Sequence, residues 1–185
     1  TEYGSPQHDL AAIVDVAGQD GAIVVDVTAT DATIPALQFA IDRGYAAATA
    51  NKLPLTGPQA VFDSLTRSGR FRYESTIGSA VPIIEATLGL LRANDEIRAI
   101  EGALSGTLGF LFTGLQQKAD QPGRPFSELV KEAMKRSYTE PDPRADLGGL
   151  DVARKALILA RTIGWRMELP DISPQSLTPY DLAGL

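Results

Sequence analysis

The chain has 185 residues, of which 44% are apolar and 22% charged, with a formal net charge of -6 and no cysteine. This composition is ordinary for a globular protein of one domain or slightly more, and the lack of cysteine excludes disulfides, thiolate catalysis and zinc–thiolate sites. No apolar run approaches the ~18 residues of a membrane span, no secretory signal is visible and basic residues are not clustered. We therefore expect a cytoplasmic protein that binds neither membranes nor nucleic acid. The single histidine, His8, is expected at the surface.

The first part of the chain predicts a βαβ unit. Residues 9–17 have helical spacing, and the β-branched run 22–28 predicts a strand buried on both faces. Residues 31–44 predict a helix that stops at a glycine, and residues 45–50 predict a second strand. Strand, helix and strand at this length indicate a parallel sheet. The G-x-G-x-x-G of dinucleotide-binding folds does not occur, so we expect the chain to begin after that loop.

Beyond Lys52 the sequence predicts helices with occasional strands. Strands are expected over residues 70–76 and 96–105, and another is expected to start near residue 171. Helices are expected over the ranges 57–69, 82–94, 106–120, 125–137 and 151–164. The predicted fold class is α/β: the C-terminal part of a Rossmann-type parallel sheet over residues 1–56, then an α+β domain over residues 57–185.

Three loops that follow predicted strands are candidates for chemistry. Thr28 lies beyond the first strand, where parallel sheets bind ligands, so it suits either a cofactor contact or a helix cap. Lys52 lies beyond the second strand and suits either a surface position or a contact to a substrate carboxylate or reacting oxygen. The small residues of 73–82 suit either a plain turn or backbone carbonyls that coordinate a hard cation. In the stretch 102–110, Ser105 or Thr107 suits a helix cap.

The run TEPDPRADLGGLDVARK, residues 139–155, concentrates acidic side chains before a helix. Asp151 and Lys155 are four residues apart and share a helix face, which as a surface pair would contribute only ~0.3–0.5 kcal/mol. The apolar residues around them indicate a helix that is largely buried, with Lys155 near the entrance. A lysine drawn out of water releases its proton more readily, whereas neighbouring carboxylates oppose this. Lysine, carboxylate and tyrosine are the proton-transfer groups that this composition leaves.

Several stretches occur together in an order that resembles the homoserine dehydrogenase family. They are ANKLPL, YESTIGSAVPII, GALSGTLGFLF and YTEPDPRADLGGLDVARKALILAR. The resemblance extends from about Ala22 to the end of the chain. The motif EPDPR is most similar to the class that contains the bifunctional aspartate kinase–homoserine dehydrogenases and the fungal enzymes.

The resemblance implies an activity. Such enzymes interconvert L-aspartate 4-semialdehyde and L-homoserine with NADP or NAD, on the route to threonine, methionine and isoleucine, and the residues from 57 onward would form a substrate-binding domain that makes a homodimer. By the same resemblance, Lys155 exchanges the proton on the reacting oxygen and Lys52 lies between nicotinamide and substrate. Glu140 would bind the substrate amino group, with Asp146 and Asp151 near that group and the catalytic lysine.

The resemblance also implies binding positions for the cofactor and for an ion. Thr28 and Lys52 correspond to cofactor contacts. A monovalent cation, often sodium, would be held largely by backbone carbonyls of Glu74, Ile77, Ser79 and Val81. Ser137 stands where the family usually has glycine, and a side chain there would crowd the nicotinamide or its loop.

Compared with the family, the chain lacks the glycine-rich phosphate loop and the closing segments, so as a fragment it is expected to be inactive and to bind cofactor weakly. The alternative hypothesis is a non-catalytic substrate-binding and dimerisation module. A further alternative is a different Rossmann-type oxidoreductase that acts on another semialdehyde.

Overall fold

The computed structural model describes residues 9–79, 81–116, 123–140 and 142–178. His8 and the last part of the strand expected from residue 171 lie outside these ranges. The strand prediction is wrong for the described part, residues 171–178, which contains no strand and starts in a 3₁₀ turn. Contacts divide the chain into two compact units, one formed by residues 1–97 with 157–171 and the other by residues 98–156 with 172–185. The boundary expected near residue 56 stays a prediction.

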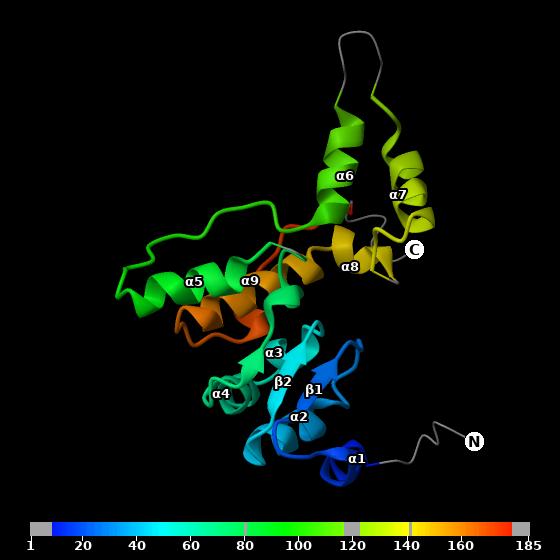
Figure 1. The fold of residues 1–185 in the computed structure, drawn as a ribbon. Helices are drawn as coiled ribbons and strands as arrows, with labels where there is room; N and C mark the ends of the chain where they lie inside the picture. Colours follow the sequence, from blue (N-terminus) through cyan, green and yellow to red (C-terminus); the bar gives the residue numbers. More distant parts are fainter. Residues whose placement is uncertain (1–8, 80, 117–122, 141, 179–185) are drawn as a thin grey trace, which may run out of the picture. The chain divides into compact units, whose positions relative to one another are not determined.

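The first unit contains a small parallel sheet and most of the helices (Figure 1). In chain order its elements are α1 (Leu10–Ala17), β1 (Ile23–Asp26), α2 (Ile34–Asp42), β2 (Ala46–Thr49), α3 (Leu53–Thr56), α4 (Gln59–Thr66), β3 (Phe71–Arg72), the 3₁₀ turn η1 (Glu74–Thr76) and α5 (Ile83–Arg92). The unit also takes the second half of α9 (Leu150–Thr162) and the 3₁₀ turn η2 (Leu169–Asp171).

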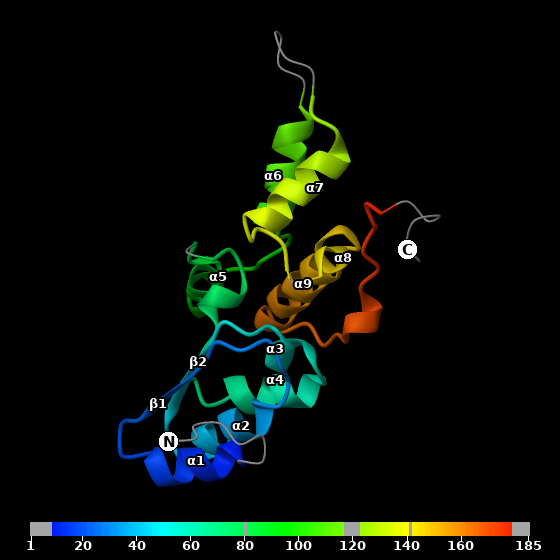
Figure 2. The same cartoon turned by 90° about the vertical axis from the view of Figure 1, so that its right-hand side faces the viewer.

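The sheet has the order β1-β2-β3, and both pairs of strands are parallel. Its register places Val24 beside Ala47 and Ala47 beside Phe71. Helix α2 connects β1 to β2, which confirms the predicted βαβ unit and the α/β fold class. Because neighbours in register point to the same face, Val24, Ala47 and Phe71 share one face, and helices α1, α2 and α4 lie on one side of the sheet (Figure 2).

The prediction that both faces of the first strand are buried is wrong. Ile23 and Val25 are 66% and 63% exposed, whereas Asp26 on the opposite face is buried. Within the described residues the helices of this unit cover only one face, and β1 is an edge strand. A run of β-branched residues predicts a strand, but it does not say how many layers will pack against it.

Two other strand predictions need correction. Over residues 70–76 only Phe71–Arg72 pairs with β2, because the chain then tightens into η1. Residues 96–105 form no strand, because this segment has no ladder with another part of the described chain. A strand needs a partner for its backbone donors and acceptors, and local sequence does not reveal whether one is available.

The second unit is helical within its described residues. It contains α6 (Gly106–Leu115), α7 (Phe126–Lys135), α8 (Pro143–Leu147) and the first half of α9. Helices α6 and α7 lie side by side around a core of Leu111, Leu129 and Ala133 (Figures 1 and 2). Of the two candidate caps of α6, Ser105 is the one that acts, since its hydroxyl accepts a hydrogen bond from the Leu108 N–H at 3.1 Å.

Helices α2, α5, α7 and α9 end in the same way. At each end a residue with positive φ is followed by a residue whose N–H reaches back five positions to a carbonyl in the last turn. The positive-φ residues are Gly44, Asn94, Ser137 and Gly164, with φ of 81°, 59°, 56° and 93°. Because only glycine adopts this conformation without strain, Ser137 occupies a position for which glycine is better suited. None of the helices in the described ranges is long and apolar enough to cross a membrane.

Candidate active site

A pocket of about 440 Å³ lies wholly within the second unit. It forms where the start of α6, the segment 138–140, α8 and the first turns of α9 meet. The lining residues are Ser105, Gly106, Thr107, Phe110, Tyr138, Thr139, Glu140, Asp146, Asp151 and Lys155. The pocket thus brings together four of the residues predicted from sequence, namely three acidic residues and one lysine, and we call it the acidic pocket.

Lys155 enters the acidic pocket from α9 and is held at its tip by two oxygen atoms. Its Nζ lies 2.7 Å from Asp151 Oδ2, one helical turn earlier, and donates a hydrogen bond to the Leu104 carbonyl at 2.8 Å. The two side chains are only 13% and 7% exposed, so this ion pair is shielded from solvent in a way that an ordinary surface pair is not. Asp151 lies in the first turn of α9, which begins at Leu150, and its carboxylate contacts the lysine.

Asp146 lies beneath the segment 138–140 and is 4% exposed. Its Oδ2 accepts a hydrogen bond from the Glu140 N–H at 2.8 Å, and its Oδ1 lies 3.1 Å from the Thr107 hydroxyl. Burial raises the pKa of Asp146 above its ordinary value, and the charges of Asp151 and Glu140 add to this rise, against the opposing effect of its hydrogen bonds.

The Thr107 hydroxyl lies between two acceptors, the Tyr138 carbonyl and the Asp146 carboxyl group. The Thr107 hydroxyl lies 2.5 Å from the Tyr138 carbonyl oxygen and 3.1 Å from Asp146 Oδ1, yet a hydroxyl has a single proton to donate. Its single proton is shared between these two acceptors, so neither receives a full hydrogen bond from Thr107. Thr107 therefore faces the pocket rather than capping α6, and it links two of the segments that form the pocket.

A second group of polar residues lies in the first unit, where β1 and β2 end. The buried Asp26 is its centre. Asp26 accepts hydrogen bonds from the Thr28 N–H at 2.9 Å, the Thr28 hydroxyl at 2.8 Å, the Thr33 hydroxyl at 2.9 Å and the Asn51 amide at 3.1 Å. Burial opposes ionisation of this carboxyl group, but the hydrogen bonds outweigh it and lower the pKa of Asp26.

This network positions the two predicted cofactor residues. Thr28 is exposed beyond β1 with its hydroxyl bound to Asp26, and Lys52 directly follows Asn51 beyond β2. Asn51 also donates to the Thr30 carbonyl at 2.7 Å, which ties the two loops together. Sequence reasoning missed both Asp26 and Asn51 as organising residues. The available signal was an acidic residue at the end of an apolar strand with threonines nearby.

The predicted cation residues lie along η1 and the turn before α5. The Glu74 carboxylate accepts hydrogen bonds from the Ile84 and Glu85 N–H groups, each at 2.8 Å, and so caps the start of α5. Ile77 is fully buried, and Ser79 has a positive φ of 56°. The described residues contain no cluster of three or more acidic or histidine side chains that could hold a metal ion. A cation here would therefore depend on neutral backbone carbonyls.

The sequence profile of the homoserine dehydrogenase family matches residues 82–183, which is more than half of the chain. The chain belongs to the homoserine dehydrogenase family. A bifunctional aspartokinase/homoserine dehydrogenase from Daucus carota is 41% identical over 168 residues, covering 88% of this chain and 18% of that protein. A homoserine dehydrogenase from Emericella nidulans is 34% identical over 191 aligned positions, covering all of this chain and 52% of that protein.

Solved structures of homoserine dehydrogenases share the fold. A putative homoserine dehydrogenase from Archaeoglobus fulgidus matches with a TM-score of 0.76 at 29% identity. The match covers 91% of this chain and 52% of the chain in that structure. The chain thus spans about half, or much less, of the length of the family members it matches. All the residues that line the acidic pocket, from Ser105 to Lys155, fall between positions 82 and 183. The pocket therefore lies within the part of the chain that the family profile matches.

Proposed function

We propose that the protein containing this chain is a homoserine dehydrogenase that interconverts L-aspartate 4-semialdehyde and L-homoserine with a nicotinamide cofactor. The observation that carries the proposal is the acidic pocket, in which a buried lysine is placed among three carboxyl groups. The substrate amino acid carries an ammonium group, which suits the carboxyl groups of Glu140 and Asp146. Its reacting oxygen needs a proton donor, which suits the Lys155 ammonium.

The chemistry of each residue follows from its contacts. Reduction of the aldehyde places negative charge on oxygen, and a nearby ammonium stabilises that charge and supplies the proton. Asp151 and the Leu104 carbonyl hold the Lys155 side chain so that its Nζ stays at the pocket. After the lysine has given its proton to the substrate oxygen it takes up another from solvent, and the Asp151 carboxylate at 2.7 Å favours this charged form.

The carboxyl ends of β1 and β2 suit the cofactor. Thr28 offers an exposed position beyond β1, and Lys52 offers a cation beyond β2. Such groups match the phosphates and amide of a dinucleotide. A bound nicotinamide supplies the hydride, while the protein orients and polarises the substrate. NADP or NAD as the cofactor, a homodimer, a cytoplasmic location and a sodium ion on the carbonyls of Glu74, Ile77, Ser79 and Val81 remain predictions.

Replacement of Lys155 tests the proposed function in the full-length protein. NADPH-dependent reduction of aspartate semialdehyde should fall by roughly 10²–10⁴-fold in Lys155→Ala, the range typical of a lost acid–base group. Lys131→Ala is the matched control, because Lys131 is an exposed lysine on α7 away from the pocket lining. Turnover near the wild-type value in a folded Lys155→Ala protein would refute the assignment.

The alternative function, a non-catalytic binding and dimerisation module, is favoured by one observation. All residues that line the acidic pocket belong to the second unit, so the pocket needs nothing from the residues that suit the cofactor. Calorimetry on this chain with homoserine and with NADPH distinguishes the two readings. Homoserine binding together with no catalysis by the full-length protein would favour the module.

A further inference from the structure

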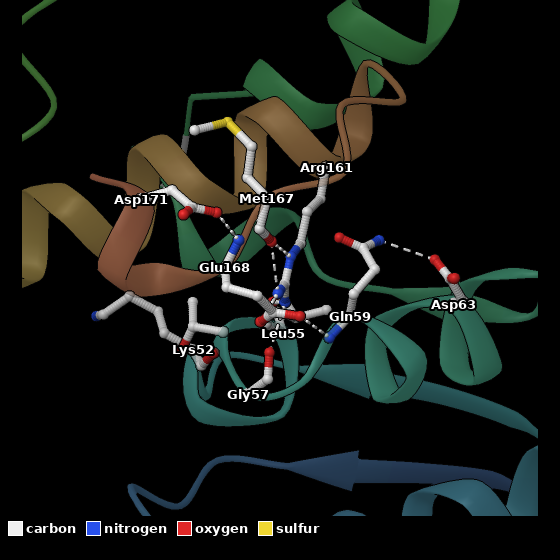
Figure 3. A network of polar contacts seen from close by, with 10 residues as sticks. Lys52, Leu55, Gly57, Gln59, Asp63, Arg161, Met167, Glu168 and Asp171 are labelled. Carbon is white, nitrogen blue, oxygen red and sulfur yellow. Dashed lines mark hydrogen bonds and ion pairs between the residues drawn. The ribbon is translucent and has the colours of Figure 1, made fainter.

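Arg161 is a fully buried cation in the second half of α9, and all five of its N–H donors are used (Figure 3). Nη1 donates to the carbonyls of Leu55 at 2.7 Å and Gly57 at 2.8 Å. Nε and Nη2 donate to the Met167 carbonyl at 3.0 and 2.9 Å, and Nη2 also contacts Glu168 Oε2 at 2.8 Å. A guanidinium has no other donors, so its position and orientation are completely determined by these partners.

Two of these acceptors belong to the turn that starts at Lys52. Helix α3 has only four residues and cannot satisfy its own last carbonyls, which Arg161 does instead, with its positive charge at the negative end of the helix. At the other end of the same turn, the Lys52 carbonyl accepts hydrogen bonds from the Leu55 N–H at 3.1 Å and the Thr56 hydroxyl at 3.0 Å. Lys52 is therefore one hydrogen-bonded turn from the carbonyls that Arg161 binds.

Glu168 extends this anchoring to the start of α4. One of its carboxylate oxygens pairs with Arg161, and the other accepts a hydrogen bond from the Gln59 N–H at 2.9 Å. The Arg161–Glu168 pair thus holds the connection between α3 and α4 at three backbone positions, 55, 57 and 59. We call this arrangement the Arg161 clamp. In Figure 3 the Lys52 side chain lies at the edge of the clamp and points away from the guanidinium.

Packing of the core alone does not explain an arginine at position 161. Removing a guanidinium from water is costly, and an apolar side chain of similar size is often neutral or stabilising in its place. What the guanidinium adds is a fixed geometry for two carbonyls that an apolar residue would leave without donors.

We propose that Arg161 is a positioning residue for Lys52: the clamp sets the turn that carries this lysine toward the cofactor and substrate. This inference rests on the proposed function only for the task of Lys52. The clamp itself rests on contacts within the first unit.

A double-mutant cycle in the full-length protein tests the catalytic part. Arg161→Lys keeps the charge but has three donors on a single atom for the four acceptor atoms of the clamp. It should lower kcat by about 10- to 100-fold, the cost of a misplaced group, with a smaller effect on KM. In a Lys52→Ala background the same change should alter kcat by less than about twofold, because the residue it positions is gone. If the two substitutions lower kcat by independent factors that multiply in the double variant, the proposal is overturned.

Amide hydrogen exchange on this chain tests the clamp without any activity. In Arg161→Lys the Leu55 and Gly57 amides should exchange at least about tenfold faster, while the β2 amides stay unchanged. The control is Arg166→Met, which removes an exposed arginine that pairs with Asp63 nearby. Unchanged exchange at positions 55 and 57 would overturn the clamp, whereas faster exchange in a protein inactive toward aspartate semialdehyde would support the clamp and refute only the proposed function.

Glu168→Gln keeps both tests decisive if Arg161→Lys does not fold. Its side chain is half-exposed, and glutamine retains one acceptor oxygen for two donors. Faster exchange at the Gln59 amide and a fall in kcat that disappears in Lys52→Ala are the expected results. A variant that behaves as wild type in both measurements would contradict the proposal.

Discussion

Asp26 and Asp146 are both buried carboxyl groups, but their surroundings shift their pKa values in opposite directions. Asp26 is surrounded by hydrogen-bond donors from Thr28, Thr33 and Asn51, which favour the charged form. Asp146 has fewer donors, and the charges of Asp151 and Glu140 lie nearby, so burial dominates and favours the neutral form. A simple amide substitution should therefore have opposite consequences at the two positions.

Asp146→Asn should stabilise the fold at neutral pH. Because the folded pKa of Asp146 lies above the unfolded value, the folded chain holds this proton more tightly, and stability is lost as pH rises through the folded pKa. Asparagine stays neutral, and its amide can donate to Thr107 while its oxygen accepts from the Glu140 N–H. Urea unfolding should give a higher free energy of unfolding for Asp146→Asn than for wild type at about pH 7. Below pH 3.8, the ordinary pKa of this carboxyl group, the two proteins should have equal free energies of unfolding. A loss of stability at neutral pH would contradict a raised pKa of Asp146 in the folded chain.

Asp26→Asn should destabilise the fold by about 1–3 kcal/mol at neutral pH, because one oxygen replaces two acceptors and an NH₂ group faces other donors. The folded pKa lies below the unfolded value, so the stability that Asp26 contributes is present above the unfolded pKa and lost as pH falls through the folded pKa. The difference between variant and wild type should accordingly shrink on acidification. A difference that stays constant with pH would show that the charge of Asp26 is not responsible.

At the scale of elements, residues at the helix ends determine where several helices begin and end. Ser105 caps α6, and Glu74 caps α5 from a distance in sequence. Four helices close on a residue with positive φ, and at α7 that residue is Ser137. The geometry gives a physical reason for glycine at this position, since a serine there carries the strain of a left-handed backbone.

Ser137→Gly should stabilise the fold by about 0.5–1 kcal/mol, since relief of backbone strain exceeds the added freedom of the unfolded chain. Asn94→Gly is the matched control at the equivalent position of α5, and its gain should be smaller because asparagine tolerates this conformation better. Urea unfolding of both variants measures the two gains. A larger gain at position 94 than at 137 would contradict the explanation.

Glu74→Ala should cost about 0.5–2 kcal/mol, the usual effect of losing a helix cap. The Ile84 and Glu85 amides lose their acceptor and should exchange faster with solvent. Glu101→Ala, at an exposed acidic residue, should change neither quantity. Normal protection of the two α5 amides in Glu74→Ala would show that another group satisfies them.

At the scale of the whole molecule, the two units carry different parts of the candidate chemistry. The first unit holds Thr28 and Lys52 at the end of a parallel sheet, and the second holds the acidic pocket. With three carboxyl groups and one ammonium among its lining residues, the pocket favours a ligand with a positive charge.

Homoserine should therefore stabilise this chain against heat, whereas N-acetylhomoserine, which lacks the ammonium group, should not. A ligand at 100 times its dissociation constant adds about 2.7 kcal/mol to the free energy of unfolding. Glu140→Gln should weaken the effect, and Glu128→Gln, at an exposed position on α7, should leave it unchanged. Equal stabilisation by the two ligands would exclude recognition of the ammonium.

The sequence by itself determined the βαβ unit, most helices and a cap of α6 at Ser105 or Thr107, and its family resemblance grouped Glu140, Asp146, Asp151 and Lys155. These features depend on periodicity, on glycine and capping residues, and on a motif whose members lie close in the chain. Only the tertiary structure decided that β1 has an exposed face, that residues 96–105 lack a strand partner, and that Thr107 belongs to the pocket. The roles of Asp26 and Arg161 were also decided there, because Asn51 lies 25 positions from Asp26, and the Leu55 and Gly57 carbonyls lie 106 and 104 positions from Arg161. Burial and hydrogen bonding at such separations arise from packing, and local sequence carries no signal of which distant backbone atoms will need a donor.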